Sequence, residues 1–161
     1  MDPCHSLRTR SSSLDEQMPQ ELKPIAEILV PMDFSDCSKT ALHYAMRIAA
    51  GSDARIHLLY VCDDPLLTAP TTSEKFRDEH ADKMSLKFVE LLDSGQREQF
   101  NTVMSVRFGT AYHEIETYAE ENGIELIVMG NVGRSAIADV LLGSVASHII
   151  RKACCPVLSV K

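Results

Sequence analysis

The stretch Leu126-Ile127-Val128-Met129-Gly130-Asn131-Val132-Gly133 is followed, after nine further residues, by Gly143-Ser144. Its first four residues are an apolar run typical of a buried strand, and an amphipathic segment at 145–152 begins directly after Ser144. In α/β proteins, a strand, a glycine-punctuated loop and a helix start present backbone N–H groups to a phosphate, because the first N–H groups of a helix lack partners. Glycine in such a loop permits positive φ and close approach of a ligand. The stretch therefore predicts an α/β fold with a nucleotide site after a central strand.

Short apolar runs and amphipathic segments alternate over the rest of the chain. Strands are predicted at 28–30, 56–62, 103–108, 126–129 and 157–160. Helices are predicted from the N-cap candidates Ser35, Asp36 and Ser38 to Gly51, at 73–94, from Gly109-Thr110 to Gly123, and at 145–152. A Pro-containing loop is predicted at 63–72. Strict alternation of strands and crossover helices predicts a parallel sheet with helices on both faces, a three-layer α/β sandwich.

The apolar spacing within the predicted helices indicates their buried faces. For the first helix the buried residues are expected to be Ala41, Ala45, Ile48 and Ala49. For the helix at 73–94 they are expected to be Phe76, His80, Met84, Phe88, Leu91 and Leu92. For the helix after Gly109-Thr110 they are expected to be Ala111, Ile115, Tyr118 and Ala119.

Length and composition limit the class of protein. The 161 residues suit one domain, expected at 25–161, and the Pro- and Ser-containing segment 1–24 is predicted to be a flexible leader. The formal net charge of −7 disfavours non-specific binding to nucleic acid, so no nucleic-acid partner is expected. No apolar run approaches the ~18 residues that span a bilayer, and we expect a cytoplasmic protein without a membrane span. The five cysteines include no C-x-x-C pair and are expected to be ordinary thiols.

Two other strand ends carry suggestive groups, since ligands of open parallel sheets bind beyond the carboxyl ends of the strands. Asp33 could accept a hydrogen bond from a ribose hydroxyl or an adenine amino group; alternatively, Asp33 or Ser35 caps the following helix. The backbone of Tyr60-Val61-Cys62 could pair with the edge of a base. The chain contains neither a P-loop nor a G-x-G-x-x-G fingerprint, so P-loop phosphotransfer and a standard NAD site are not expected.

Over about residues 25–161, this order of residues resembles the universal stress protein family. The resemblance rests on Ile28-Leu29-Val30-Pro31-Met32-Asp33-Phe34-Ser35, Ile127-Val128-Met129-Gly130, the Gly130-x2-Gly133-x9-Gly143-Ser144 loop and Cys155-Pro156-Val157-Leu158-Ser159-Val160-Lys161. It implies an adenine nucleotide alpha hydrolase-like fold with a five-stranded parallel sheet in the order 3-2-1-4-5. Members with the glycine loop bind ATP or AMP, so the resemblance implies an adenine-nucleotide-binding homodimer that acts as a stress-response sensor or regulator.

The resemblance also implies which residues meet the adenosine part of the ligand. Asp33 would contact the adenine or the ribose, and Pro31 and Met32 would shape the base pocket. Val61 would pair with the adenine through its backbone, while Met129 would pack beside the base or the sugar.

A second set of residues is implied for the sugar and phosphates. Gly130 and Gly133 would let the loop wrap the ribose and phosphates. Gly143, Ser144 and Val145 would hold the phosphates through their N–H groups and the Ser144 hydroxyl. Arg134 would add a charged contact, unless it is a solvated loop arginine.

The chain departs from the family pattern at two places. Met32 stands where many relatives have a small or hydroxylated residue, and Asn131-Val132 replaces a common Ser/Thr-His/Arg pair. The second departure removes a polar side chain near the phosphates, which affects triphosphate affinity and metal contact more than adenosine binding. The expected cofactor is ATP or AMP, with Mg²⁺ accompanying ATP; Asp63-Asp64 could bind that ion or form a solvated acidic turn.

No enzymatic activity is expected beyond incidental ATP hydrolysis. The histidines at 43, 57, 80, 113 and 148 are scattered, and no nucleophile is paired with a general base. Two alternatives remain open: a nucleotide-independent dimeric stress or scaffold protein with a structural glycine loop, and a slow ATPase. An unidentified protein partner is expected in addition to a second copy of the chain, which would pair through the apolar edge strand at 156–160.

Overall fold

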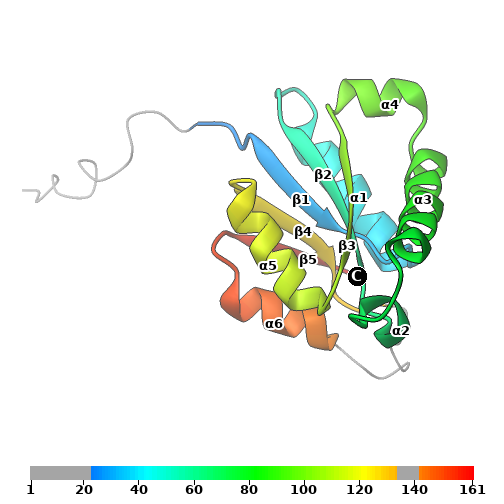
Figure 1. Cartoon of the computed structure of the whole chain (residues 1–161). Coiled ribbons are helices and arrows are strands. Elements are labelled where there is room, and N and C mark those ends of the chain that lie inside the picture. The colour runs from blue at the N-terminus through cyan, green and yellow to red at the C-terminus, as the bar shows by residue number, and fades with distance from the viewer. Residues whose placement is uncertain (1–22, 134–141) are drawn as a thin grey trace, which may run out of the picture.

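The computed structural model describes residues 23–133 and 142–161, in which five strands form one parallel sheet in the order β3-β2-β1-β4-β5 (Figure 1). The strands are β1 (Glu27–Pro31), β2 (Arg55–Cys62), β3 (Val103–Phe108), β4 (Leu126–Gly130) and β5 (Val157–Val160). The predicted bounds of β3 and β5 are confirmed. Strands β2 and β4 are each one residue longer than predicted, and β1 is longer by one residue at both ends. Residues 1–22 of the predicted leader lie outside the described residues.

Strand β1 lies at the centre of the sheet, and this position explains why its sequence is apolar. Leu29 pairs with His57 on β2 and with Ile127 on β4. Ile28, Leu29 and Val30 are fully buried because side chains of a strand alternate between two faces, and here both faces are covered.

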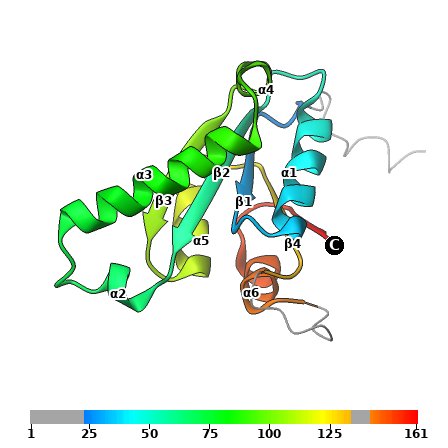
Figure 2. The same cartoon turned by 90° about the vertical axis from the view of Figure 1, so that its right-hand side faces the viewer.

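Helices cover both faces of the sheet, which confirms the three-layer architecture. The helices α1 (Asp36–Ala49) and α3 (Glu74–Leu91) cover one face, and Figure 2 shows them in front of the sheet. The helices α5 (Ala111–Glu121) and α6 (Ser144–Lys152) cover the other face (Figure 1). Two apolar clusters separate the layers, one on each side of the sheet. Within 23–133 and 142–161, no helix is both long enough and apolar enough to cross a bilayer.

The segment between β2 and β3 differs most from its prediction. The helix expected at 73–94 ends at Leu91, and a second helix, α4 (Ser94–Gln99), begins after Asp93. Asp93 and Gln96 form a capping box, the local signal at which a new helix begins. A short helix, α2 (Pro65–Thr68), lies within the predicted loop at 63–72.

Two residues expected in the core are exposed instead. Phe76 on α3 is 55% exposed and Ile48 on α1 is 37% exposed, so both predictions are wrong. The buried faces are narrower than the apolar spacing suggests: α3 buries Met84 and Phe88, and α1 buries small residues such as Ala45.

Candidate functional site

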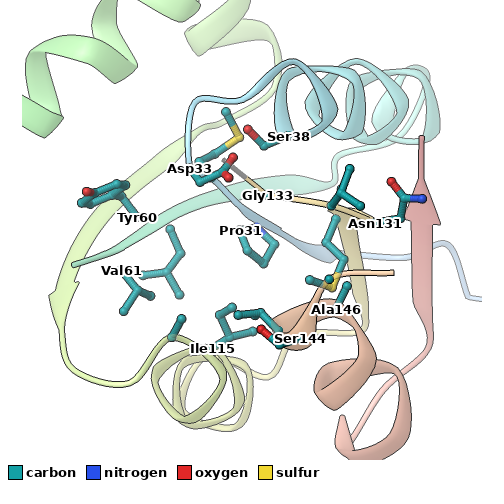
Figure 3. A pocket seen from close by; sticks show the side chains of 18 of the residues that line it. Pro31, Asp33, Ser38, Tyr60, Val61, Ile115, Asn131, Gly133, Ser144 and Ala146 are labelled. Carbon is teal, nitrogen blue, oxygen red and sulfur yellow. The ribbon is translucent and has the colours of Figure 1, made fainter. Parts of the chain in front are cut away.

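A cavity of about 570 Å³ opens at the carboxyl ends of β1, β2 and β4 (Figure 3). Ten of the eleven predicted site residues line it, which are Pro31, Met32, Asp33, Val61, Met129, Gly130, Gly133, Gly143, Ser144 and Val145. The eleventh, Arg134, lies outside the described residues. The structure thus brings together residues from four separate segments, while their contact with a ligand stays a prediction.

The end of β1 places a carboxylate at the cavity. Asp33 Oδ1 accepts hydrogen bonds from the N–H of Ser35 at 3.0 Å and from its hydroxyl at 2.6 Å. Ser35 is the N-cap of α1, because its Oγ accepts the N–H of Ser38 at 3.3 Å. Of the two roles considered for Asp33, the helix cap belongs to Ser35, and Asp33 both orients that cap and lines the cavity. Met32 is buried, and its N–H donates to the carbonyl of Leu59 at 2.8 Å.

The backbone of Val61 at the end of β2 is directed toward the same cavity. Because the Leu59 carbonyl accepts from Met32, the backbone groups of Leu59 face β1. Backbone directions in a strand repeat every two residues, so the N–H and C=O of Val61 face the same side. The pairing of β1 with β2 ends at Pro31 and Leu59, so Val61 lies beyond the last pair, where β1 has ended. Its backbone is therefore placed to pair with a planar ligand edge.

Gly130, at the end of β4, is required by the neighbouring helix. A Cβ on Gly130 would lie 2.9 Å from the Cβ of Cys37 and 3.0 Å from its carbonyl carbon, both in the first turn of α1. Glycine here allows α1 to pack directly on β4. The loop glycines do not use the positive φ that glycine permits, since the described glycines with positive φ are Gly51, Gly109 and Gly123.

The other two loop glycines allow close approach within the loop. A Cβ on Gly133 would lie 2.9 Å from Oδ2 of Asp33. The absence of a side chain at Gly133 therefore lets the loop pass close to the end of β1. The N–H of Gly143 donates to the carbonyl of Asn131 at 2.6 Å. The N–H of Gly143 thus closes the loop, while contact of Gly143 with a phosphate stays a prediction.

The N-terminus of α6 provides the remaining N–H groups. Gly143 is its N-cap and has no side chain to accept from the first turn. The N–H groups of Ser144 and Val145, both in this first turn, have no intrahelical acceptor, and both residues line the cavity. An α-helix N-terminus favours anions, so this wall is suited to a negative group.

Apolar side chains of α5 and α6 form the wall opposite β1. Figure 3 shows Ile115 and Ala146 on the far side of the cavity from Asp33. Sequence reasoning placed Ile115 on a buried stripe, which is confirmed, but not at the site. Asn131, which is 7% exposed, and Ser38 also line the cavity without having been predicted to do so. Their positions depend on how α1 and the loop pack, for which the sequence carries no local signal.

Among the described residues that line the cavity, the charged groups are the carboxylates of Asp33 and Asp63. Asp63 lines the cavity and is exposed, whereas Asp64 accepts the N–H of Leu66 at 2.9 Å and caps α2. Within the described ranges, no cluster of three or more metal-ligating side chains is present. Burial raises the pKa of the Cys62 thiol, at the end of β2, above its ordinary value.

The histidines of the described chain lie away from the cavity lining. His57 is buried near the start of β2, where its Nε2 lies 2.7 Å from Glu27 and its Nδ1 lies 2.9 Å from the Tyr118 hydroxyl. This is a packing role at the opposite end of the strand. The arrangement at the cavity can bind and orient a ligand with an anionic end and a planar apolar part.

Comparison with known proteins agrees with this architecture. Residues 25–161 match the universal stress protein family. The chain is 35% identical, over 142 residues, to universal stress protein MJ0531 of Methanocaldococcus jannaschii, a match that covers 84% of this chain and 81% of that protein. It is 33% identical, over 148 residues, to universal stress protein G of Escherichia coli O157:H7, with 83% of this chain and 97% of that protein covered.

Solved structures of such proteins share the fold. The universal stress protein UspA of Lactobacillus plantarum superposes with a TM-score of 0.66 at 28% identity, over 87% of this chain and all of that chain. A universal stress protein in complex with cAMP superposes with a TM-score of 0.59 at 25% identity, over 86% of this chain and 98% of that chain. The sheet order, the helix layers and these matches agree, and the chain belongs to the universal stress protein family.

Proposed function

We propose that the protein binds an adenine nucleotide in the cavity at the ends of β1, β2 and β4. The observation that carries this proposal is the convergence of Asp33, the Val61 backbone and the first turn of α6 on one cavity. Its volume of about 570 Å³ lies within the ~300–1,000 Å³ of small-molecule sites. The three groups suit a hydroxylated sugar, a base edge and a phosphate, respectively.

The residues that line the cavity support this proposal. Pro31, Ile115 and Val145 are apolar walls for a base, and Val61 offers backbone donors and acceptors to its edge. The Asp33 carboxylate, held by Ser35, can accept from ribose hydroxyls. Gly133 has no side chain to fill the space beside the Asp33 carboxylate, which a Cβ at this position would approach to 2.9 Å.

The proposed ligand is ATP or AMP, which places the chain in the glycine-loop subclass of its family. A relative of the same fold was solved with cAMP, an adenine nucleotide with one phosphate. Mg²⁺ remains part of the proposal as the companion of ATP, with Asp63 as the exposed carboxylate at the cavity. A dependence of ATP affinity on added Mg²⁺ tests this part.

Calorimetric titration with AMP, ADP and ATP tests the binding. We expect saturable binding by the wild type and at least tenfold weaker binding by Asp33→Asn, as for loss of a hydrogen bond to a charged group. Asp36→Asn is the matched control, because this fully exposed carboxylate pairs with Lys39 and lies outside the cavity lining. Flat heats with all three nucleotides on folded wild-type protein would contradict the proposal.

We further propose that nucleotide occupancy regulates a homodimer that takes part in a stress response. The edge strand β5 supports pairing with a second copy, since its outer backbone groups have no neighbouring strand in the described sheet. A dimer that forms and functions without any nucleotide would favour the scaffold alternative.

We propose that the protein is not an enzyme. Phosphate release well above background would instead favour the slow ATPase. A cytoplasmic location is part of the proposal, and cell fractionation tests it.

A further inference from the structure

The residue between Asp33 and Ser35 has a backbone conformation that L-amino acids rarely adopt. Phe34 has φ of +64°, and the other described non-glycine residue with positive φ is Asn101. Asparagine tolerates this region because its short side chain can hydrogen-bond locally, whereas a bulky aromatic residue there is an outlier. Such a conformation persists where surrounding structure holds it.

Contacts on the α1–α3 face of the sheet hold the ring of Phe34. Its centroid lies 5.3 Å from the ring of Phe88 and 5.5 Å from that of Tyr60. The ammonium group of Lys87 lies 5.2 Å from the ring centroid. Phe88 is fully buried, so the partner that anchors the ring from α3 is itself fixed. The ring is therefore tied to α3 and β2.

The same turn directs the preceding carboxylate the other way. Asp33 lines the cavity, whereas Phe34 does not. Asp33 accepts both the N–H and the hydroxyl of Ser35, the residue on the far side of Phe34. These two hydrogen bonds span Phe34, so its backbone conformation and the position of the Asp33 carboxylate are linked.

We propose that Phe34 is a positioning residue whose anchored ring holds the left-handed turn that aims Asp33 at the ribose hydroxyls. This inference rests on the proposed nucleotide binding. It assigns to Phe34 the selectivity of the site for nucleotides that carry ribose hydroxyls. No residue of α3, a helix described over its whole length, lines the cavity. Through Phe34, α3 nevertheless determines how well the cavity distinguishes a ribonucleotide from a nucleotide that lacks these hydroxyls.

Two variants separate positioning from simple packing. Phe34→Ala and Phe34→Gly both remove the ring, so both should lower the melting temperature. Only alanine is strained at φ of +64°, because glycine adopts this region freely. The measured quantity is the ratio of the Kd for 2′,3′-dideoxy-AMP to that for AMP. We expect about tenfold or more for the wild type, most of that ratio for Phe34→Gly, and a ratio near one for Phe34→Ala.

The control is Leu92→Ala, which empties a buried position of the same apolar cluster at a distance in sequence from the turn. It should lose stability and keep the wild-type ratio. Equal ratios for Phe34→Ala and Phe34→Gly, or a wild-type ratio in Phe34→Ala, would overturn the inference.

Amide hydrogen exchange at Ser35 tests the turn without any ligand. This N–H donates to Asp33, so it should stay more protected in Phe34→Gly than in Phe34→Ala. Equal exchange in the two variants overturns the anchoring of the turn. A wild type that binds neither nucleotide overturns the proposed function, and with it the role of Phe34 in selectivity.

Discussion

The hydroxyl of Ser35 donates a 2.6 Å hydrogen bond to Asp33 and accepts one, at 3.3 Å, from the N–H of Ser38. One side chain thus connects the first turn of α1 with the carboxylate at the cavity. The residue that begins the helix also orients the group that would meet a ligand, so stability and binding are coupled at this point.

Replacement of Ser35 should affect both properties. Ser35→Ala should lower the free energy of unfolding by about 1 kcal/mol, because the N-cap of α1 is lost. It should also weaken AMP binding, because Asp33 loses one of its two hydrogen bonds from Ser35. Ser35→Thr keeps a hydroxyl and should retain most of both properties. Urea unfolding and calorimetry measure the two effects, and a Ser35→Ala protein that is unchanged in both would contradict this account.

Gly130 and Gly133 should respond differently to the same change. Gly130→Ala places a methyl group 2.9 Å from the Cβ of Cys37 and should destabilise the fold by about 1–3 kcal/mol, as overpacking does. Among the described residues, the new methyl group of Gly133→Ala meets only the end of the Asp33 side chain, at 2.9 Å. It should therefore change nucleotide affinity and leave the melting temperature close to that of the wild type.

Thermal unfolding and calorimetry of the two glycine variants provide this comparison. Each variant serves as the control for the other, because both add one methyl group in the same loop region. A stable Gly130→Ala protein would show that α1 can move away from β4 at little cost.

The direction of the backbone groups of β5 makes the proposed dimer testable with one proline. The carbonyls of Pro156 and Val160 accept from Ile127 and Asn131, so even-numbered residues of this strand face β4. The N–H of Ser159 therefore points outward. Ser159→Pro should remove an intermolecular donor without breaking the β4–β5 ladder, and should yield a monomer by light scattering. Ser159→Ala should remain dimeric; a dimeric Ser159→Pro protein would place the interface elsewhere.

The adjacent cysteines should differ in reactivity. Burial, followed by the neighbouring Cys154, raises the pKa of Cys155 to about 11, whereas Cys154 is exposed. Since the thiolate is the nucleophile, only about one Cys155 thiol in a thousand is ionised at pH 8. Iodoacetamide at pH 8 should label the C-terminal peptide of Cys155→Ser at least tenfold faster than that of Cys154→Ser. Equal rates would contradict the assignment.

The raised pKa of Cys155 also predicts how its contribution to the free energy of unfolding changes with pH. The folded state keeps the Cys155 proton that the unfolded chain loses near the ordinary thiol pKa of 9.0. The contribution of this residue is therefore fully present below about pH 8 and is lost as the pH rises toward 11. Cys155→Ser should lose less stability over this range in urea titrations.

The sequence predicted the strands well because their signals are local. An apolar run such as 126–129 needs no partner to be recognised, and the alternation of apolar and polar residues at 103–108 indicates a strand with one wetter face. The break in the helix predicted at 73–94 also had a local signal, the Asp93-x-x-Gln96 capping box, which apolar spacing alone does not detect. Asp64 followed by Pro65 was a comparable signal for α2.

The sequence predicted which residues line the candidate site, but not the structural reasons why several of them are needed there. Ten predicted residues meet at one cavity, because the carboxyl ends of neighbouring parallel strands share one edge. The need for glycine at 130 comes from α1, more than ninety residues away in the chain, and the Gly143 N–H is engaged by Asn131. The positive φ of Phe34 depends on ring contacts with α3 and β2. Such tertiary causes leave no trace in local spacing.

The absence of a side chain at Gly130 lets α1 and β4 meet backbone to backbone, at the point where the cavity begins. The turn that carries Asp33 and the loop that starts at Asn131 are therefore attached to two elements that pack directly on each other. We therefore expect a ligand that displaces either of these two segments to displace the other as well.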